Sequence, residues 1–179
     1  MLTDKEQVVS GCKRRDPHAM KQLYDELSPM MLGVCMRYTR SRDEAQDLLH
    51  DGFIKVYENI NQLKNPLAVV TWVYQIMVNL SINYVTRNTE LMYCDIEQMD
   101  EGEGNIHKVE WDDDVKGGEV EEIVRALQEI PNRYRLVFNM REVDEMGFDE
   151  IAEELKMPEA TVRSYVARAK KLILEKIKK

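Results

Sequence analysis

The chain has 179 residues, 44% of them hydrophobic, and a formal net charge of −8 at pH 7. This apolar fraction excludes a disordered protein, and the sparse Gly and Pro favour an all-α fold. The three cysteines lack the spacing of a zinc site or a disulfide framework, and no stretch of 18 apolar residues occurs, so we expect a cytoplasmic protein without metal, cofactor or membrane insertion.

The first predicted helix covers residues 16–39. Asp16 is a suitable N-cap, and Pro17 suits the first helical position because an N–H there would have no partner within the helix. Pro29 favours a kink or a break inside this helix. The apolar residues that recur at helical spacing are Leu23, Leu27, Met30, Met31, Val34 and Tyr38.

A second helix is predicted over residues 41–63, because Ser41 and Glu44 have the spacing of a capping box. Asp47, Asp51 and Glu58 share one face, at positions i, i+4 and i+11. On spacing alone, this acidic stripe indicates either a solvated surface or a contact surface for a partner. The opposite, apolar face consists of Ala45, Leu48, Leu49, Phe53, Val56 and Ile60.

A third helix follows the polar turn NQLKN and covers residues 65–88. Its predicted apolar stripe consists of Val69, Val73, Ile76 and Leu80, flanked by Trp72 and Tyr74. Its polar side consists of Thr71, Gln75, Asn79, Asn83, Thr86 and Arg87. Aromatic rings stack on bases and amides form hydrogen bonds with them, so this helix is compatible with a nucleic-acid surface. Core aromatics beside a wet face explain the pattern equally well.

The negative charge is concentrated in residues 91–122, which hold 2 basic and 12 acidic residues. Residues 1–90 hold 11 of each sign, and residues 123–179 hold 12 basic and 10 acidic residues. With four Gly and no periodicity, the acidic segment is typical of an extended linker. We therefore predict two domains, residues 1–90 and 119–179, joined by an acidic flexible linker at residues 91–118. The alternative is that this segment occupies a basic groove on a partner or mimics nucleic acid.

The C-terminal domain is predicted to contain four helices. The first breaks at Pro131, and the second covers roughly residues 132–143. The third, FDEIAEEL, is short, with Ile151, Ala152 and Leu155 inside. A turn, KMP, separates it from the last helix, which begins near Pro158. A short helix, a tight turn and a longer basic helix indicate a helix-turn-helix.

The last helix carries most of the local positive charge, since residues 156–179 hold eight Lys or Arg and two Glu. Its predicted buried stripe consists of Val162, Val166, Ala169, Ile173 and Ile177. The opposite face consists of Ala160, Thr161, Ser164, Ala167, Arg168 and Lys171. Small residues there allow close approach to base edges, while Arg163, Lys170 and Lys171 can reach phosphates. A coiled-coil or membrane-surface helix is the alternative, but the preceding helix and turn argue against both.

Three blocks, in order, resemble conserved blocks of the extracytoplasmic-function RNA polymerase sigma factors. They are DEAQDLLHDGFIKVYENI, TWVYQIMVNLSINYVTRN and, after the acidic linker, FDEIAEELKMPEATVRSYVARAKKLI. Each block alone is modest, but the ordered set is specific and covers nearly the whole chain. The resemblance implies a sigma-2-like bundle and a sigma-4-like helix-turn-helix. It implies bacterial core RNA polymerase, promoter DNA and an anti-sigma factor as partners.

The resemblance also implies residue roles. Core polymerase contact is implied for Asp47 and Asp51. Recognition and melting of the −10 element is implied for Lys64, Asn65, Trp72, Asn79, Asn83 and Arg87. Recognition of the −35 element is implied for Thr161, Arg163, Ser164, Arg168, Lys170 and Lys171.

The sequence also departs from the family pattern. The first domain has Val69 where an aromatic residue is common, and Gln75 and Val78 where Arg is frequent, which weakens its expected phosphate grip. In the last domain, Tyr165 stands where Arg is common and Lys156 where Gly is common.

Two other classes of function remain as alternatives. A stand-alone helix-turn-helix regulator would leave the first domain without a role. An enzyme is disfavoured because the chain has no P-loop, HExxH, GxSxG or Cys/His cluster, so we expect no catalytic residue.

Overall fold

The computed structural model describes residues 4–88, 123 and 125–177, and these residues form helices and turns without a strand. The predicted all-α class is therefore confirmed. The chain divides into two compact units between Tyr84 and Val85. The predicted acidic linker at residues 91–118 lies outside the described residues.

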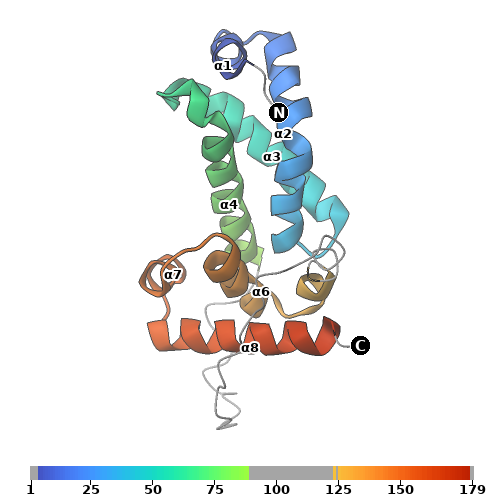
Figure 1. Cartoon of the computed structure of the whole chain (residues 1–179), viewed down its shortest axis with the longest axis vertical. Helices are drawn as coiled ribbons and strands as arrows, with labels where there is room; N and C mark the ends of the chain where they lie inside the picture. The colour runs from blue at the N-terminus through green and yellow to red at the C-terminus, as the bar shows by residue number, and fades with distance from the viewer. Residues whose placement is uncertain (1–3, 89–122, 124, 178–179) are drawn as a thin grey trace. The chain divides into compact units, whose positions relative to one another are not determined.

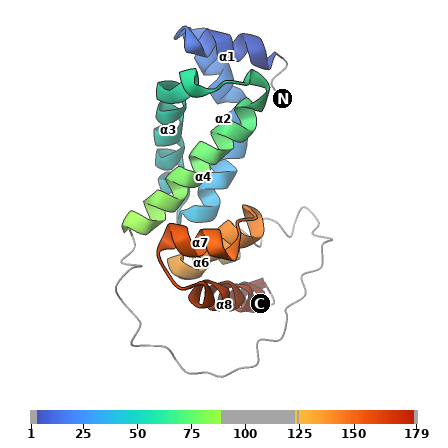
Figure 2. The same ribbon diagram turned by 90° about the vertical axis from the view of Figure 1, so that its left-hand side faces the viewer.

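Four α-helices make up the N-terminal part of the chain. They are α1 (Lys5–Lys13), α2 (Pro17–Tyr38), α3 (Arg42–Asn59) and α4 (Val69–Asn88), with the short 3-10 turns η1 (Ile60–Gln62) and η2 (Pro66–Ala68) between α3 and α4. Helices α2, α3 and α4 form an elongated bundle, and α1 lies across one end of it, beside η1 and η2 (Figures 1 and 2).

Helix α1 was not expected from the sequence. Asp4 caps its start, because Asp4 Oδ1 accepts a hydrogen bond of 2.9 Å from the N–H of Gln7. The helix ends in a left-handed residue, Arg15, with φ of 61°. The N–H groups of Arg15 and Asp16 then bond the carbonyls of Cys12 and Gly11, each at 3.0 Å. This is a Schellman turn with an arginine at the position that glycine usually occupies.

The predicted starts of α2 and α3 are confirmed. Pro17 is the first residue of α2, and Pro29 lies inside a helix that runs unbroken to Tyr38. At α3, Ser41 Oγ accepts the N–H of Glu44 at 3.2 Å. The Glu44 carboxylate accepts a hydrogen bond of 2.9 Å from the N–H of Arg40. In a capping box, this second hydrogen bond would come from the N–H of the cap residue, Ser41.

The core of this bundle is formed by the inner faces of α2, α3 and α4. Fully buried residues include Leu23, Met31, Cys35, Ala45, Val56, Val69, Val73 and Met77. Helices α3 and α4 approach closely at Gly52, where an added Cβ would collide with the Met77 side chain. Along α4 the buried stripe continues through Met77 and Val85, whereas the predicted stripe residues Ile76 and Leu80 are only half-buried.

The segment Pro66–Arg87 is long and apolar enough, by length and composition alone, to cross a membrane. Core helices of soluble proteins pass the same test. Here one side of α4 is buried in the bundle and the other side is polar and exposed, which is the pattern of an amphipathic helix.

The C-terminal unit consists of several short helical elements and one long helix, α8. Residues 125–129 are helical, followed by α6 (Asn132–Phe138), a π turn η3 (Asn139–Val143), α7 (Phe148–Leu155) and α8 (Glu159–Ile177). Its core cluster consists of Ala126, Leu127, Ile130, Phe138, Ala169 and Ile173. Helices α7 and α8 form the predicted helix-turn-helix, with Ile151, Val162 and Val166 buried between the elements.

The turn between α7 and α8 has the same form as the turn after α1. Lys156 is left-handed, with φ of 52°, and the N–H of Met157 bonds the carbonyl of Ala152 at 3.0 Å. A left-handed residue at this place explains why glycine would be expected there.

Candidate nucleic-acid interface

The exposed side of α8 carries three residues predicted to meet −35 DNA. Ser164, Arg168 and Lys171 are exposed, whereas Thr161 is half-buried. Among the residues that the structure describes, neither Arg168 nor Lys171 forms an ion pair. The predicted buried stripe holds, with Val162, Val166, Ala169 and Ile173 buried and Ile177 half-buried. The rotation of the helix therefore presents two free cations and a hydroxyl together.

Two other cations of α8 are paired with carboxylates across the unit. Lys170 Nζ lies 2.8 Å from Glu142 Oε2, and only 20% of the Lys170 side chain is exposed. Lys176 Nζ lies 2.7 Å from Glu129 Oε2, and its hydrogen bond holds the pKa of Glu129 below the usual value. Lys170 therefore ties α8 to η3. Lys170 has to break its ion pair with Glu142 before it can contact a DNA phosphate.

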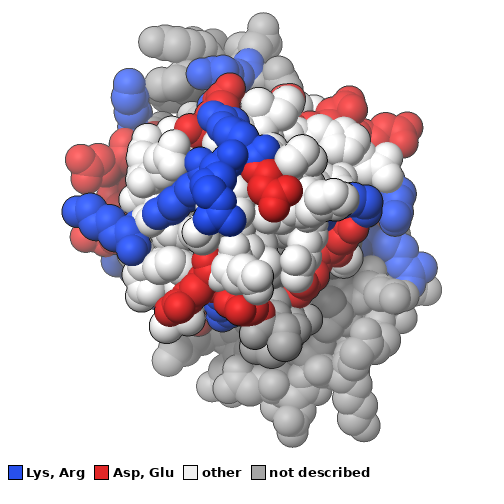
Figure 3. All heavy atoms as spheres, turned by 90° about the horizontal axis from the view of Figure 1, so that it is seen from above, with Lys and Arg blue, Asp and Glu red and all other residues white. Residues whose placement is uncertain are grey.

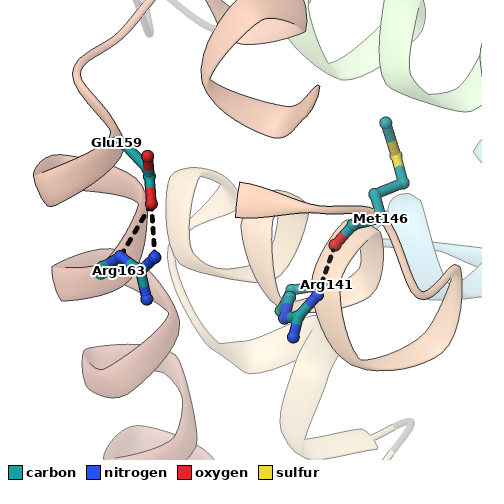
Figure 4. Close-up of polar contacts among 4 residues, drawn as sticks. All are labelled: Arg141, Met146, Glu159 and Arg163. Atoms are coloured by element: carbon teal, nitrogen blue, oxygen red, sulfur yellow. Dashed lines mark hydrogen bonds and ion pairs between the residues drawn. The ribbon is translucent and has the colours of Figure 1, made fainter. Parts of the chain in front are cut away.

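Arg163 is held in place by two neighbours. Its Nε donates to Glu159 Oε1 at 3.0 Å, and its Nη2 donates to the same oxygen (Figure 4). Its Cζ lies 4.1 Å from the centre of the Phe148 ring. Arg141 stacks on the same ring at 4.5 Å and donates to the carbonyl of Met146 at 2.8 Å (Figure 4). The first helix of the helix-turn-helix thus orients an arginine on the second.

The exposed side of α4 is polar and almost uncharged. Asn79 and Asn83 are exposed, and Asn83 Nδ2 donates to the carbonyl of Asn79 at 2.8 Å. Arg87 is also exposed and is the single charged residue of the helix, while Trp72 is half-buried. The Tyr74 hydroxyl accepts a hydrogen bond from Arg37 at 3.2 Å. This face of α4 therefore presents amide side chains that can form hydrogen bonds with a nucleic acid. The half-buried Trp72 lies on the same helix.

Lys64 and Asn65 lie in the turn between η1 and η2, and both are exposed. Asn65 Oδ1 accepts the N–H of Leu67 at 3.0 Å, which shapes the turn from within. Helix α1 holds it from outside: Lys13 Nζ donates to the carbonyl of Leu63 at 2.8 Å, and a lysine at the start of α1, Lys5, donates to the carbonyl of Leu67 at 3.5 Å. The turn predicted to take part in −10 recognition is thus supported by a helix that the sequence did not reveal.

Helix α3 presents Asp47, Asp51 and Glu58 to solvent, as predicted. The same face also carries Ile54, which is 56% exposed. Ile54 is seven residues after Asp47 and therefore lies on the same helix face as the predicted acidic stripe. The prediction of this stripe considered only charged residues and so omitted Ile54. A single exposed apolar side chain is common on protein surfaces, and here it lies among three exposed carboxylates.

The remaining reactive groups are covered or scattered. Cys12 and Cys35 are free and buried, and burial raises the pKa of each thiol to about 11. Within residues 4–88 and 125–177, no group of three or more His, Cys, Asp or Glu is placed to hold a metal ion.

Two family models match the chain in the order of its two units. Sigma-70 region 2 matches residues 23–90, and sigma-70 region 4 matches residues 120–173. The chain belongs to the sigma-70 family. As a sigma factor it directs core RNA polymerase to promoters for transcription initiation, with α2 to α4 in region 2 and α7 to α8 in region 4. Helix α1 precedes the region 2 match.

Curated relatives are similar over nearly their whole length. The ECF RNA polymerase sigma-E factor of Haemophilus influenzae is 29% identical, with 98% of this chain and 96% of that protein covered. The RNA polymerase sigma-H factor of Pseudomonas aeruginosa is also 29% identical, with 97% and 94% covered. Among solved structures, the sigma factor RpoE of Bartonella quintana, in complex with the anti-sigma factor NepR, has a TM-score of 0.48 and 17% identity, covering 88% of this chain and 96% of that one.

Proposed function

We propose that this sigma factor divides promoter recognition between its two units. The observation that carries the proposal is the exposed Ser164, Arg168 and Lys171 face of a helix-turn-helix recognition helix, which suits duplex −35 DNA. The amide face of α4 and the turn at Lys64 and Asn65 suit the unpaired bases of a melted −10 element. The domain boundaries at residues 1–90, 91–118 and 119–179 belong to this proposal.

We assign core polymerase contact to the outer face of α3. Asp47 and Asp51 supply negative charge, and Ile54 between Asp51 and Glu58 supplies an apolar centre. Interfaces combine such an apolar centre with a polar rim. The complementary surface on core polymerase is then basic around an apolar contact.

Three further properties belong to this proposal. The protein contributes binding energy to promoter opening and no catalytic group of its own. It acts in the cytoplasm, where core polymerase transcribes. An anti-sigma factor restrains it, as the family resemblance implies.

The test is assembly with core polymerase followed by run-off transcription on a genomic promoter library. Wild-type protein is expected to form a holoenzyme and to give discrete transcripts. Binding of operator DNA without any assembly with core polymerase would favour the stand-alone regulator instead.

The α3 surface is tested with Asp47→Ala/Asp51→Ala, which is expected to lower core affinity roughly fivefold to tenfold, or about 1–1.4 kcal/mol. The melting temperature should hold, because exposed helix charges add little stability. The matched control is Glu6→Ala/Asp25→Ala, which removes the same charge from exposed positions on α1 and α2. If both double variants bind core polymerase with equal affinity, Asp47 and Asp51 belong to a solvated surface and do not contact core polymerase.

A further inference from the structure

Helix α4 carries a single cation on the face where the proposed DNA strand lies. On α4, Gln75 is an exposed amide, Val78 is buried, and Arg87 is the single charge. Most of the affinity of proteins for nucleic-acid backbones comes from cations. A phosphate grip for this unit therefore has to come from another element.

The cations of this end of the unit lie on α1 and the turn that it supports. The last turn of α1 runs into Arg14 and Arg15, both exposed, and Lys64 is exposed on the neighbouring turn. The Lys13 to Leu63 hydrogen bond of 2.8 Å brings the two segments together. Figure 3 looks onto the α1 end of the unit and shows Lys and Arg side chains gathered near its centre.

The carboxylates of Asp4, Glu6 and Asp16 lie close in sequence to this charge, and Figure 3 shows acidic side chains beside the basic ones. Asp16, the next residue in sequence, has its Oδ1 engaged as the cap of α2, where it accepts the N–H of His18 at 3.0 Å. Arg14 Nη1 donates to Ser10 Oγ, a neutral partner, at 2.6 Å. In the described part of the chain, neither Arg14, Arg15 nor Lys64 has a carboxylate within ion-pair distance.

The left-handed backbone at Arg15 adds to this arrangement. Its φ of 61° is costly for a residue with a side chain, and glycine is the usual choice at this position of a Schellman turn. A long cation is present there instead. The turn carries positive charge at a position where the backbone alone would favour glycine.

We propose that Arg14 and Arg15, together with Lys64, bind the phosphate backbone of a single DNA strand next to the turn at Lys64 and Asn65. A strand that follows the amide face of α4 toward its N-terminus reaches this turn first and α1 next. Helix α1 therefore supplies the phosphate grip that α4 lacks. This inference rests on the proposed function of α4 and extends it to a helix outside the region 2 match.

The experiment uses full-length protein assembled with core polymerase. The probe is a fork-junction DNA, single-stranded over the −10 element, taken from a promoter that the holoenzyme transcribes. Its affinity is measured between 50 and 200 mM salt for wild type, Arg14→Ala/Arg15→Ala and Arg14→Lys/Arg15→Lys. The matched control is Arg40→Ala/Arg42→Ala, two exposed arginines at the turn between α2 and α3.

The alanine pair is expected to lower the salt slope by between one and two units, since each phosphate contact on a single strand contributes about 0.7. At low salt its affinity should fall several-fold, while the lysine pair and the control keep the wild-type slope. Core affinity and binding to duplex −35 DNA should stay unchanged.

The inference is overturned if Arg14→Ala/Arg15→Ala behaves as the control pair does, or if its −35 duplex binding falls equally. Failure of the proposed function looks different, because wild type itself would then not assemble with core polymerase or bind the fork. A thermal melt separates loss of binding from loss of fold.

Discussion

Helices α4 and α8 are both proposed to meet promoter DNA, but with different chemistry. Helix α8 exposes two cations, Arg168 and Lys171, on a face that opposes a buried stripe. Helix α4 exposes amides and one terminal charge, Arg87. Cations attract the backbone of duplex and single-stranded DNA alike, whereas amides bind base edges and aromatic rings stack on bases that are unpaired. We therefore expect duplex binding through α8 and strand binding through α4 to differ in their salt dependence.

The largest expected effect is at Arg168. Arg168→Ala should cost about 1–3 kcal/mol on cognate −35 DNA and relax preference at one base pair. Lys170→Ala should weaken all sequences alike and also loosen the unit, because it breaks the pair with Glu142. Selection of −35 variants with each mutant checks this. An unaltered preference in Arg168→Ala, with a shifted one in Lys170→Ala, would mean that the rotation of α8 has been misjudged.

The next effect sharpens the role of α4. Asn79→Ala/Asn83→Ala should lower holoenzyme affinity for single-stranded −10 DNA by about 0.5–1.5 kcal/mol for each base hydrogen bond lost. The salt slope should not change, because no cation is removed. Gln46→Ala, an exposed amide on α3, is the control. A changed slope in the double variant would break the distinction between the two helices.

A smaller effect is expected at Phe148, whose ring stacks against Arg163 at 4.1 Å. Phe148→Leu keeps an apolar side chain but removes the cation–π contact, worth about 0.5–1 kcal/mol at an exposed site. Affinity for −35 DNA should fall roughly twofold to fivefold, and Phe148→Tyr should restore it.

The same loss in an Arg163→Ala background would assign the Phe148 effect to general packing. A double-mutant cycle on −35 duplex DNA makes this distinction. No additional loss is expected once Arg163 is absent.

An effect of similar size, on stability and not on binding, concerns the left-handed turn at Lys156. Lys156→Gly should stabilise the C-terminal unit by about 0.5–1 kcal/mol, because glycine adopts φ of 52° without the cost that a side chain imposes. Lys156→Ala removes the same charge and keeps the strain, so it is the control. Thermal melts of the two variants should differ, and equal melting temperatures would show that the turn is not strained.

Much of the fold could be predicted from local sequence. Asp16 with Pro17, and Ser41 with Glu44, mark helix starts through chemistry within four residues, so α2 and α3 were placed well. Helix α1 is only nine residues long, and its buried side consists of Val8, Val9, Gly11 and Cys12. So short an apolar stripe gives little periodicity to detect.

The inner face of α4 was harder to predict for a different reason. The helix is apolar on much of its circumference, so several stripes fit the sequence equally well. Packing buries Met77 fully and leaves Ile76 and Leu80 half-buried, and the Met77 side chain fills the space beside Gly52 on α3. Such a choice depends on a residue 25 positions away and is absent from local pattern.

The predicted site residues are mostly exposed, but their partners could not be foreseen. Lys170 and Arg163 look alike as cations in the sequence. In the structure, Lys170 pairs with Glu142 and Arg163 stacks on Phe148. Both contacts depend on how η3 and α7 are placed against α8, which is a property of the folded unit.

The π turn η3 has a consequence for how this segment tolerates changes of length. A π turn holds one more residue than an α-helical turn. Deleting one residue from Asn139–Val143 would replace the π turn by a regular α-helical turn, which moves the residues inside the turn relative to those that flank it. Glu142 would leave Lys170, and Arg141 would leave Phe148. Single-residue deletions here should therefore be rarer among functional variants than substitutions at the same positions.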